Sequence, residues 1–293
     1  MHPSFLSIDS DLLRRLYLNE QLTADEIATR LRCSPITVLR RLGRFAIPRR
    51  RRGPRLSPEA LREAWSPSCW SASVAWAVGV IATDGNLGRD GRHLTVTSKD
   101  RDLLDGIRKC LRVKSAIAPH NVGRGASCSR LQWSNPGQHA WLREIGLTPA
   151  KSLTLGPLAV PDTFFVDFFR GCIDGDGSIV TYVDRYNTAK KPTYIYTRLY
   201  VSLVSASLRF VEWLRATVRN IAGAWGDVEV RRAIGRNDIW RLRYAKAESL
   251  SLLRWMYYAP DIPCLRRKRD VAEPFLIPRQ AGTARRPGRP MVL

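Results

Sequence analysis

The chain is poor in the residues that build metal clusters and disulfide frameworks. Its 293 residues include six cysteines and four histidines. No two cysteines form a C-x-x-C pair, so the sequence favours reduced thiols over a zinc site or disulfide bonds. No apolar run is long enough to span a bilayer, and no secretory signal is recognisable. We therefore expect a cytoplasmic protein with no membrane partner, associated with the nucleoid in a bacterium or a phage-infected cell.

Acidic residues are also scarce, which leaves the chain strongly basic. Lys and Arg number 48 against 26 Asp and Glu, giving a formal net charge of +22, and the excess is spread along the chain. Such a charge favours a polyanionic partner that is bound with strong salt dependence. Hydrophobic residues make up 44% of the sequence, which is enough to bury a core. The composition therefore predicts a folded nucleic-acid-binding protein.

Two short stretches of the chain are similar to each other. They are AVGVIATDG at residues 77–85 and FRGCIDGDG at residues 169–177. Each is an apolar helical run with a glycine in its middle, Gly79 or Gly171. Because a glycine costs a helix about 1 kcal/mol relative to alanine, it needs a packing reason there. The pattern predicts two helices whose backbones cross closely at these glycines.

Each run closes on an aspartate followed by a glycine. Gly85 and Gly177 suit the left-handed conformation that ends many helices. Asp84 and Asp176 would then lie at helix C-termini, where the helix dipole disfavours a negative charge unless a cation neutralises it. Two such ends side by side would gather both carboxylates around a divalent metal, and oxygen ligands with retained waters are what Mg²⁺ prefers. The alternative is two core helices with solvated aspartates at their ends.

With these runs the chain resembles the LAGLIDADG homing endonucleases in their two-motif, single-chain form. The first run departs from the family nonapeptide at its sixth position, where Ala82 stands in place of a common acidic residue. The matching positions are Gly79, Ile81, Asp84 and Gly85 in the first run, and Gly171, Ile173, Asp174, Asp176 and Gly177 in the second.

This resemblance implies a metal site and basic residues beside it. Asp84 and Asp176 would bind two or three Mg²⁺ ions, with Mn²⁺ as an alternative ion. The family often holds a basic residue near each metal site, and Lys151 and Lys268 occupy equivalent places in the two repeats. We expect these lysines to be either catalytic residues or phosphate contacts.

The repeat extends beyond the two motifs. Strand patterns at 93–98 and 197–204 are followed by amphipathic helices at 103–111 and 208–214, then by a second strand pair and a short helix. Each half thus predicts helix, strand, strand, helix, strand, strand, helix, the order that the resemblance also implies. The expected fold class is α+β, with two pseudo-symmetric αββαββα halves and saddle-shaped antiparallel sheets. The halves would span 70–160 and 161–278, followed by a flexible tail at 279–293.

Strands of the second half alternate basic and aromatic residues. Arg198 shares its parity with Tyr182, Tyr196 and Tyr200. An antiparallel sheet can bury one face and expose the other, and a two-stranded ribbon fits the DNA major groove, where arginine reads guanine. We expect this face to bind DNA; the alternative is a basic face that is only solvated. The candidate arginines are Arg198, Arg231, Arg241 and Arg243.

The N-terminal segment, residues 1–47, predicts a separate all-α domain. A capping box begins at Thr23, and Ser34-Pro35 is typical of a helix start. Helices over about 11–18, 24–31 and 35–42 would form a helix-turn-helix, resembling those of resolvases and transposases, whose last helix enters the major groove. We expect its DNA contacts to be Thr37, Arg40 and Arg41. The linker 48–69 would add contacts to phosphates and the minor groove through Arg49, Arg50, Arg51 and Arg52.

Together these features predict a site-specific double-stranded DNA endonuclease of the homing type. The resemblance implies cuts across the minor groove that leave short 3′ overhangs, and a long target site. The two unequal halves predict a target that need not be palindromic. Both motifs lie in one chain, so we expect a monomer. Two alternatives use the same scaffold: a transcription regulator that has lost cleavage, and an RNA maturase.

Overall fold

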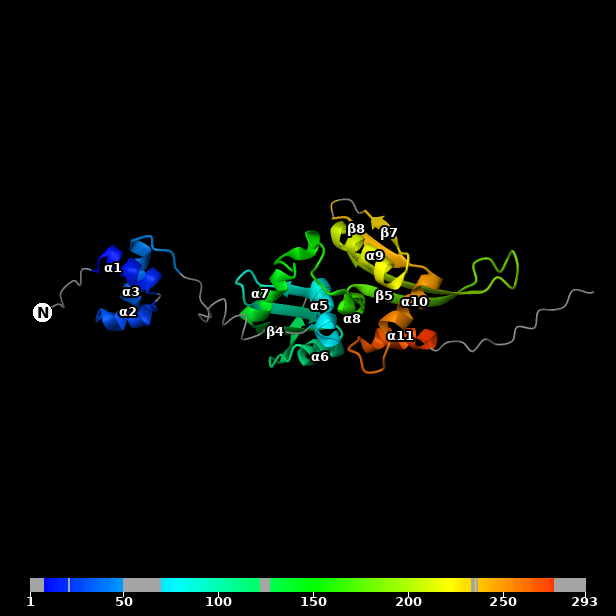
Figure 1. Cartoon of the computed structure of the whole chain (residues 1–293), viewed down its shortest axis with the longest axis horizontal. Helices are drawn as coiled ribbons and strands as arrows, with labels where there is room; N and C mark the ends of the chain where they lie inside the picture. Colours follow the sequence, from blue (N-terminus) through cyan, green and yellow to red (C-terminus); the bar gives the residue numbers. More distant parts are fainter. Residues whose placement is uncertain are drawn as a thin grey trace, which may run out of the picture. The chain divides into compact units, whose positions relative to one another are not determined.

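The computed structural model describes residues 8–20, 22–49, 70–121, 127–232, 235 and 237–276. The chain divides into two compact units, Met1–Arg55 and Leu56–Leu293 (Figure 1). The tail at 279–293 and three of the predicted DNA-binding residues, Arg50, Arg51 and Arg52, lie outside the described residues.

The N-terminal unit is a small helical bundle. Helix α1 (Ser10–Arg14) continues as a π-helical turn, η1 (Arg15–Asn19), and is followed by α2 (Ala24–Arg30) and α3 (Pro35–Arg44). The predicted caps are present, since Thr23 forms a capping box with Glu26, and the Ser34 hydroxyl accepts the Thr37 N–H at 3.2 Å. The core of the unit is built from Leu13, Leu16, Ile27, Val38 and Leu42.

The second unit consists of two halves with the same order of elements, as the sequence predicts. The third helix of each half is followed by one more element, η2 (Lys151–Leu153) in the first half and α11 (Arg266–Leu276) in the second. The first half is α5 (Ala72–Asp84), β1 (Gly85–Leu87), β2 (His93–Ser98), α6 (Arg101–Cys110), β3 (Ile117–Asn121), β4 (Ser127–Ser134) and α7 (Pro136–Glu144). The second half is α8 (Asp162–Asp174), β5 (Gly177–Asp184), β6 (Tyr196–Ser205), α9 (Leu208–Ala222), β7 (Asp227–Arg231), β8 (Ile239–Tyr244) and α10 (Lys246–Met256).

Each half contains a four-stranded antiparallel sheet, and the strand orders are equivalent, β1-β2-β4-β3 and β5-β6-β8-β7. In the first sheet Val96 lies opposite Leu131, and in the second Leu203 lies opposite Leu242. These apolar residues are buried, and the helices of each half pack on that face of its sheet. Because side chains alternate along a strand, the other face of each sheet carries the polar residues. The α+β prediction is confirmed.

The two halves meet where the motif helices α5 and α8 pack together (Figure 1). A Cβ on Gly79 would lie 2.1 Å from the Phe168 carbonyl oxygen, and a Cβ on Gly171 would lie 2.1 Å from the Trp76 carbonyl oxygen. No side chain fits at either point, so the crossing depends on the absence of a Cβ at both positions. The crossing places the ends of the two motifs next to each other.

Two details at the motif ends differ from the sequence expectation. Gly85 is not left-handed, since its φ is −85°, and Gly177 is also outside the positive-φ region. The reason for glycine is close packing, because a Cβ at either position would lie 2.6 Å from backbone atoms of Ile81 or Ile173. In addition, α8 ends at Asp174, so Asp176 lies in the turn that leads into β5 and not in the helix.

Among the described residues, no helix combines the length and apolar character needed to cross a membrane.

Candidate metal site and nucleic-acid interface

The two motif aspartates lie together at the helix crossing. Asp84 is the last residue of α5 and is partly buried. Asp176 lies in the turn before β5; the residue as a whole is exposed, but its carboxyl group lies against Asp84 and is largely surrounded by protein. Their carboxyl groups hydrogen-bond each other. Burial and the neighbouring charge of Asp176 raise the pKa of Asp84 to about 7, and burial also raises the pKa of Asp176. Two carboxyl groups this close share a proton near neutral pH unless a cation separates their charges.

The two candidate lysines flank this pair, and both are buried. Lys151 is 6% exposed and donates to the Gly85 carbonyl, while Lys268 is 4% exposed. Burial lowers the pKa of each ammonium group to about 8, against the opposing pull of nearby aspartates. The structure therefore brings the four candidate catalytic residues together. Four backbone carbonyl oxygens surround the Lys268 ammonium group and share its three N–H donors: those of Ile173 (2.6 Å), Asp174 (2.8 Å), Gly175 (3.1 Å) and Gly177 (2.7 Å).

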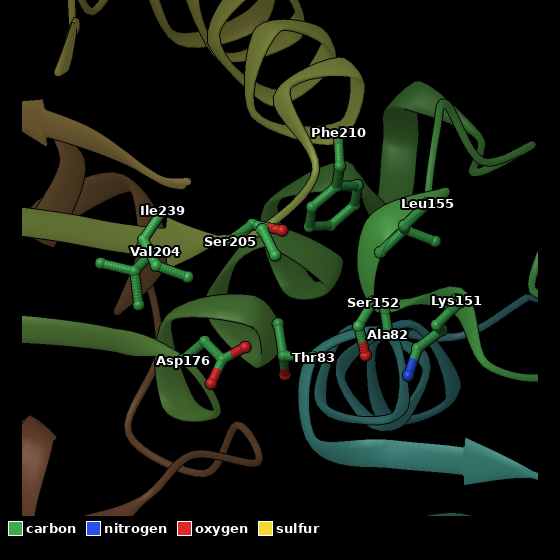
Figure 2. A pocket seen from close by; sticks show the side chains of 11 residues that line it. Ala82, Thr83, Lys151, Ser152, Leu155, Asp176, Val204, Ser205, Phe210 and Ile239 are labelled. Atoms are coloured by element: carbon green, nitrogen blue, oxygen red, sulfur yellow. The ribbon is translucent and has the colours of Figure 1, made fainter. Parts of the chain in front are cut away.

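A cavity of about 250 Å³ opens beside Asp176. Figure 2 shows Asp176 and Thr83, from the ends of the two motifs, and Lys151 with Ser152, from the segment after α7, among its lining residues. The polar lining combines a carboxylate, hydroxyls and an ammonium group. This chemistry suits water molecules and phosphate oxygens, and the cavity adjoins the carboxylate pair.

The donor set fits a hard divalent cation. In the part of the chain that the structure describes, no group of three or more His, Cys, Asp or Glu side chains gathers in metal-binding geometry. The site therefore offers two carboxylates, Asp84 and Asp176, and leaves room for water and phosphate. Mg²⁺ is held in this way, through one or two carboxylates plus retained waters and substrate phosphates. The paired, mutually repelling carboxylates fit such an ion.

The acidic residue missing from the first motif has a structural explanation. In the second motif Asp174 is fully buried, and its Oδ2 accepts the Trp76 indole N–H at 2.8 Å and the Leu265 N–H at 2.8 Å. Trp76 stands three residues before Gly79, and the residue at the same place in the second motif is Phe168. A phenyl ring has no N–H to donate, so a carboxylate at position 82 would lack the indole partner, and a buried charge without partners is costly. The small apolar Ala82 avoids that cost.

The open face of the second sheet carries all four predicted arginines. Pairing places Arg198 opposite Tyr182, Arg243 opposite Ser202, and Arg241 opposite Glu229, and paired residues share a face. Two acidic side chains hold these arginines: Arg198 pairs with Asp184 at 2.8 Å, and Arg243 pairs with Glu229 at 3.4 Å. Arg243 also lies over the Tyr200 ring, 3.9 Å from its centroid. Arg231, opposite Ile239, completes the row.

The open face of the first sheet was missed by the sequence analysis. Within the described strands it carries one arginine, Arg130, with amide, hydroxyl and imidazole side chains that the strand register brings together. Amide and hydroxyl side chains can read base edges in the major groove. The signal was present as alternation, because 93–98 and 130–133 place apolar residues at every second position. The face includes Asn86, His93, Thr95, Thr97, Arg130, Gln132 and Ser134.

The second half also has a much longer connection between its first two strands. Residues 185–195 join β5 to β6, where residues 88–92 join β1 to β2. Tyr186 is 90% exposed, and the Lys191 ammonium group lies over the Tyr194 ring at 5.6 Å. The hairpin extends the basic and aromatic character of the second sheet.

In the N-terminal unit the candidate residues lie on or beside α3. Arg40 is exposed, Arg41 is half-buried, and the Thr37 hydroxyl lies 2.9 Å from the Ser34 hydroxyl within the helix cap. Arg49 folds back and donates to the Leu39 carbonyl at 3.4 Å. Thr37 and Arg49 are thus engaged within the unit, and Arg40 is the most available of the four.

Neither a family model nor a curated protein matches this chain. Several solved structures, in contrast, are similar to it. The chain is similar to the I-LtrWI LAGLIDADG homing endonuclease bound to target DNA, with 13% identity over 69% of this chain and 89% of that chain and a TM-score of 0.47.

Two further structures show a likeness of the same degree. The meganuclease I-SmaMI bound to uncleaveable DNA matches with 13% identity over 69% of this chain and 88% of that chain, at a TM-score of 0.48. I-DmoI in complex with DNA and Ca matches with 14% identity over 69% of this chain and 96% of that chain, at a TM-score of 0.44. At these identities and scores a similarity does not transfer chemistry from one protein to another.

Proposed function

We propose that this protein is a site-specific double-stranded DNA endonuclease of the homing type. The observation that carries the proposal is the meeting of Asp84 and Asp176 at the helix crossing, with the buried Lys151 and Lys268 beside them. Two or three Mg²⁺ ions, or Mn²⁺ in their place, held by these carboxylates would lower the pKa of an attacking water and stabilise the departing 3′ oxygen.

The residues of the chain have complementary roles in this proposal. Asp84 and Asp176 act as ligands. Lys151 and Lys268 would place positive charge beside the scissile phosphates, although burial lowers the pKa of each to about 8. The repeat supplies one lysine for each strand. A single chain carries both sets of residues, so the active form would be a monomer.

DNA binding would divide between the two sheets. The arginine face of the second sheet would bind one half-site mainly through charge, and the amide and hydroxyl face of the first would bind the other half-site mainly through hydrogen bonds to bases. Different faces read different sequences, which favours a long target that is not palindromic. The exposed Arg40 on α3 would add a contact from the N-terminal unit.

The test is to incubate the full chain with a randomised double-stranded DNA library, in Mg²⁺ and in EDTA, and to sequence the ends produced. We expect discrete, metal-dependent double-strand ends. Asp84→Asn and Asp176→Asn should each lower the cleavage rate at least about 1,000-fold, since about 4 kcal/mol of transition-state stabilisation depends on the ligands. Asp102→Asn, which removes an exposed carboxylate on α6, is the matched control and should cleave normally.

Two other outcomes would point elsewhere. Sequence-selective retention of DNA without new ends in any divalent metal would leave a transcription regulator on this scaffold. Preference for a structured RNA over duplex DNA would favour a maturase.

A further inference from the structure

The second motif contains a buried charge network that the site described above does not use. Arg170, which precedes Gly171, is completely buried. Its guanidinium donates to the Pro263 carbonyl at 2.8 Å, to the Met256 carbonyl at 2.7 Å and to Asp167 at 2.6 Å. The Tyr258 hydroxyl also donates to Asp167, at 3.0 Å.

This network fixes the segment between α10 and α11, which leads to Lys268. Met256 and Pro263 lie at the two ends of the connection between α10 and α11, which has no regular secondary structure. A guanidinium fixed on α8 therefore holds the connection at both ends. Two residues beyond Pro263, the Leu265 N–H donates to Asp174, and α11 then brings Lys268 onto the end of α8.

The first half has no equivalent side chains for Lys151. The residue that precedes Gly79 is Val78, and the position that corresponds to Asp174 is Ala82. Neither can accept or donate a hydrogen bond through its side chain. Lys151 instead follows Ala150, which is left-handed with φ 55°, and donates to the Gly85 carbonyl. The two lysines thus occupy equivalent places, but the segments that carry them are held by different contacts.

We propose that Arg170 is a positioning residue for Lys268, and that it controls the cleavage of one DNA strand and not of the other. The inference rests on the proposed function, in which each lysine serves one strand. Without the guanidinium, the carbonyls of Met256 and Pro263 lose their donor, and the connection relaxes. A displacement of a catalytic group by about 1 Å can cost about 100-fold in rate.

The test measures each strand separately. A cleavable duplex is labelled differently on its two strands, and single-turnover rates are followed for Arg170→Met and for the double variant Arg170→Met with Asp167→Leu. The double variant replaces the buried ion pair by apolar residues, a change that a fold often tolerates. Both variants should cut one strand about 100-fold more slowly, leave the other unchanged, and accumulate nicked plasmid.

Two lysine variants identify which strand is affected. Lys268→Met should slow the same strand as Arg170→Met, and Lys151→Met should slow the opposite strand. The control is Ser249→Ala, which removes another fully buried side chain of the second half that bonds only backbone, accepting the Val201 N–H and donating to the Tyr244 carbonyl, both at 2.9 Å. It should affect both strands equally.

A second readout does not need cleavage. Amide hydrogen exchange should quicken at Leu265 and in the first turn of α11 in the Arg170 variants, but not in Ser249→Ala. Equal slowing of both strands by a folded Arg170 variant, slowing of the Lys151 strand, or unchanged exchange at Leu265 would each overturn the inference. Failure of the unsubstituted protein to cut any DNA would instead overturn the proposed function, and the strand assignment with it.

Discussion

The two halves of the second unit share a backbone plan and differ in the chemistry of their open faces. Both have the same order of helices and strands and meet at equivalent glycines, Gly79 and Gly171. Among the described residues, one open sheet face has one arginine with amides, hydroxyls and His93, while the other has four arginines with tyrosines and three acidic residues. Core positions are fixed by close packing, whereas open positions lie outside the core and are freer to differ.

The two motif helices also differ at equivalent positions. Trp76 and Phe168 occupy equivalent places, and the indole N–H decides which motif can bury an aspartate at its sixth position. Asp174 is present where a donor faces it, and Ala82 where none does. The departure of the first motif from the nonapeptide thus coincides with the absence of a donor on the neighbouring helix.

The largest effect is expected at the crossing, where the halves should behave alike. Gly171→Ala and Gly79→Ala each place a Cβ 2.1 Å from a carbonyl oxygen of the other helix. The helices must separate, so each variant should lose about 3 kcal/mol or more of unfolding free energy, measured in urea. Gly43→Ala on α3 has open space and should be neutral or stabilising by about 0.5 kcal/mol. Normal stability of Gly171→Ala would contradict the close crossing.

The second-largest effect concerns a hydrogen bond to the second motif that has no equivalent at the first. Trp76→Phe removes the indole donor from the buried Asp174 and should cost about 1–3 kcal/mol in unfolding free energy. In the double variant Trp76→Phe with Asp174→Ala, the loss should be smaller than the sum of the two single losses, because the partners act together. Strict additivity in a double-mutant cycle would show that the pair is not coupled and would remove our explanation for Ala82.

A smaller effect concerns the protons on the metal ligands. The pKa of Asp84 is raised to about 7, and a carboxylate binds metal only when deprotonated. The affinity of the DNA-free protein for Mn²⁺, measured by calorimetry, should therefore rise about tenfold per pH unit below pH 7 and level off above it. Asp84→Asn should weaken binding and remove this pH dependence. An affinity that is flat through pH 7 would contradict the shared proton.

The smallest effect compares the two open faces directly. Replacing Arg241 and Arg243 by Gln should lower the slope of log affinity against log salt by about two if both contact phosphates, and Arg130→Gln by about one. Thr95→Ala should leave the slope unchanged and alter base preference instead. These slopes come from binding titrations at several salt concentrations. If substitutions on the first sheet lowered the salt slope as much as those on the second, the two faces would not differ in how they bind DNA.

Much of the architecture could be predicted from the sequence. The order of helices and strands follows from apolar periodicity, the capping box at Thr23 from local side-chain chemistry, and the helix crossing from two glycines in apolar runs. The final glycines were interpreted wrongly, because a glycine needed for close packing and one needed for positive φ look the same in a sequence. The open face of the first sheet was missed because its residues carry little charge.

The sequence by itself determined the paired motifs, the repeat and the basic character of the chain, since each of these is a local pattern or a sum over residues. Only the tertiary structure decided that Asp84 touches Asp176, that Trp76 supports Asp174, and that Arg170 holds the path to Lys268. The Trp76–Asp174 and Arg170–Pro263 contacts join residues separated by more than ninety positions in the chain. No local periodicity constrains such distances, so the packing of α5 against α8 and of α11 onto the end of α8 had to set them.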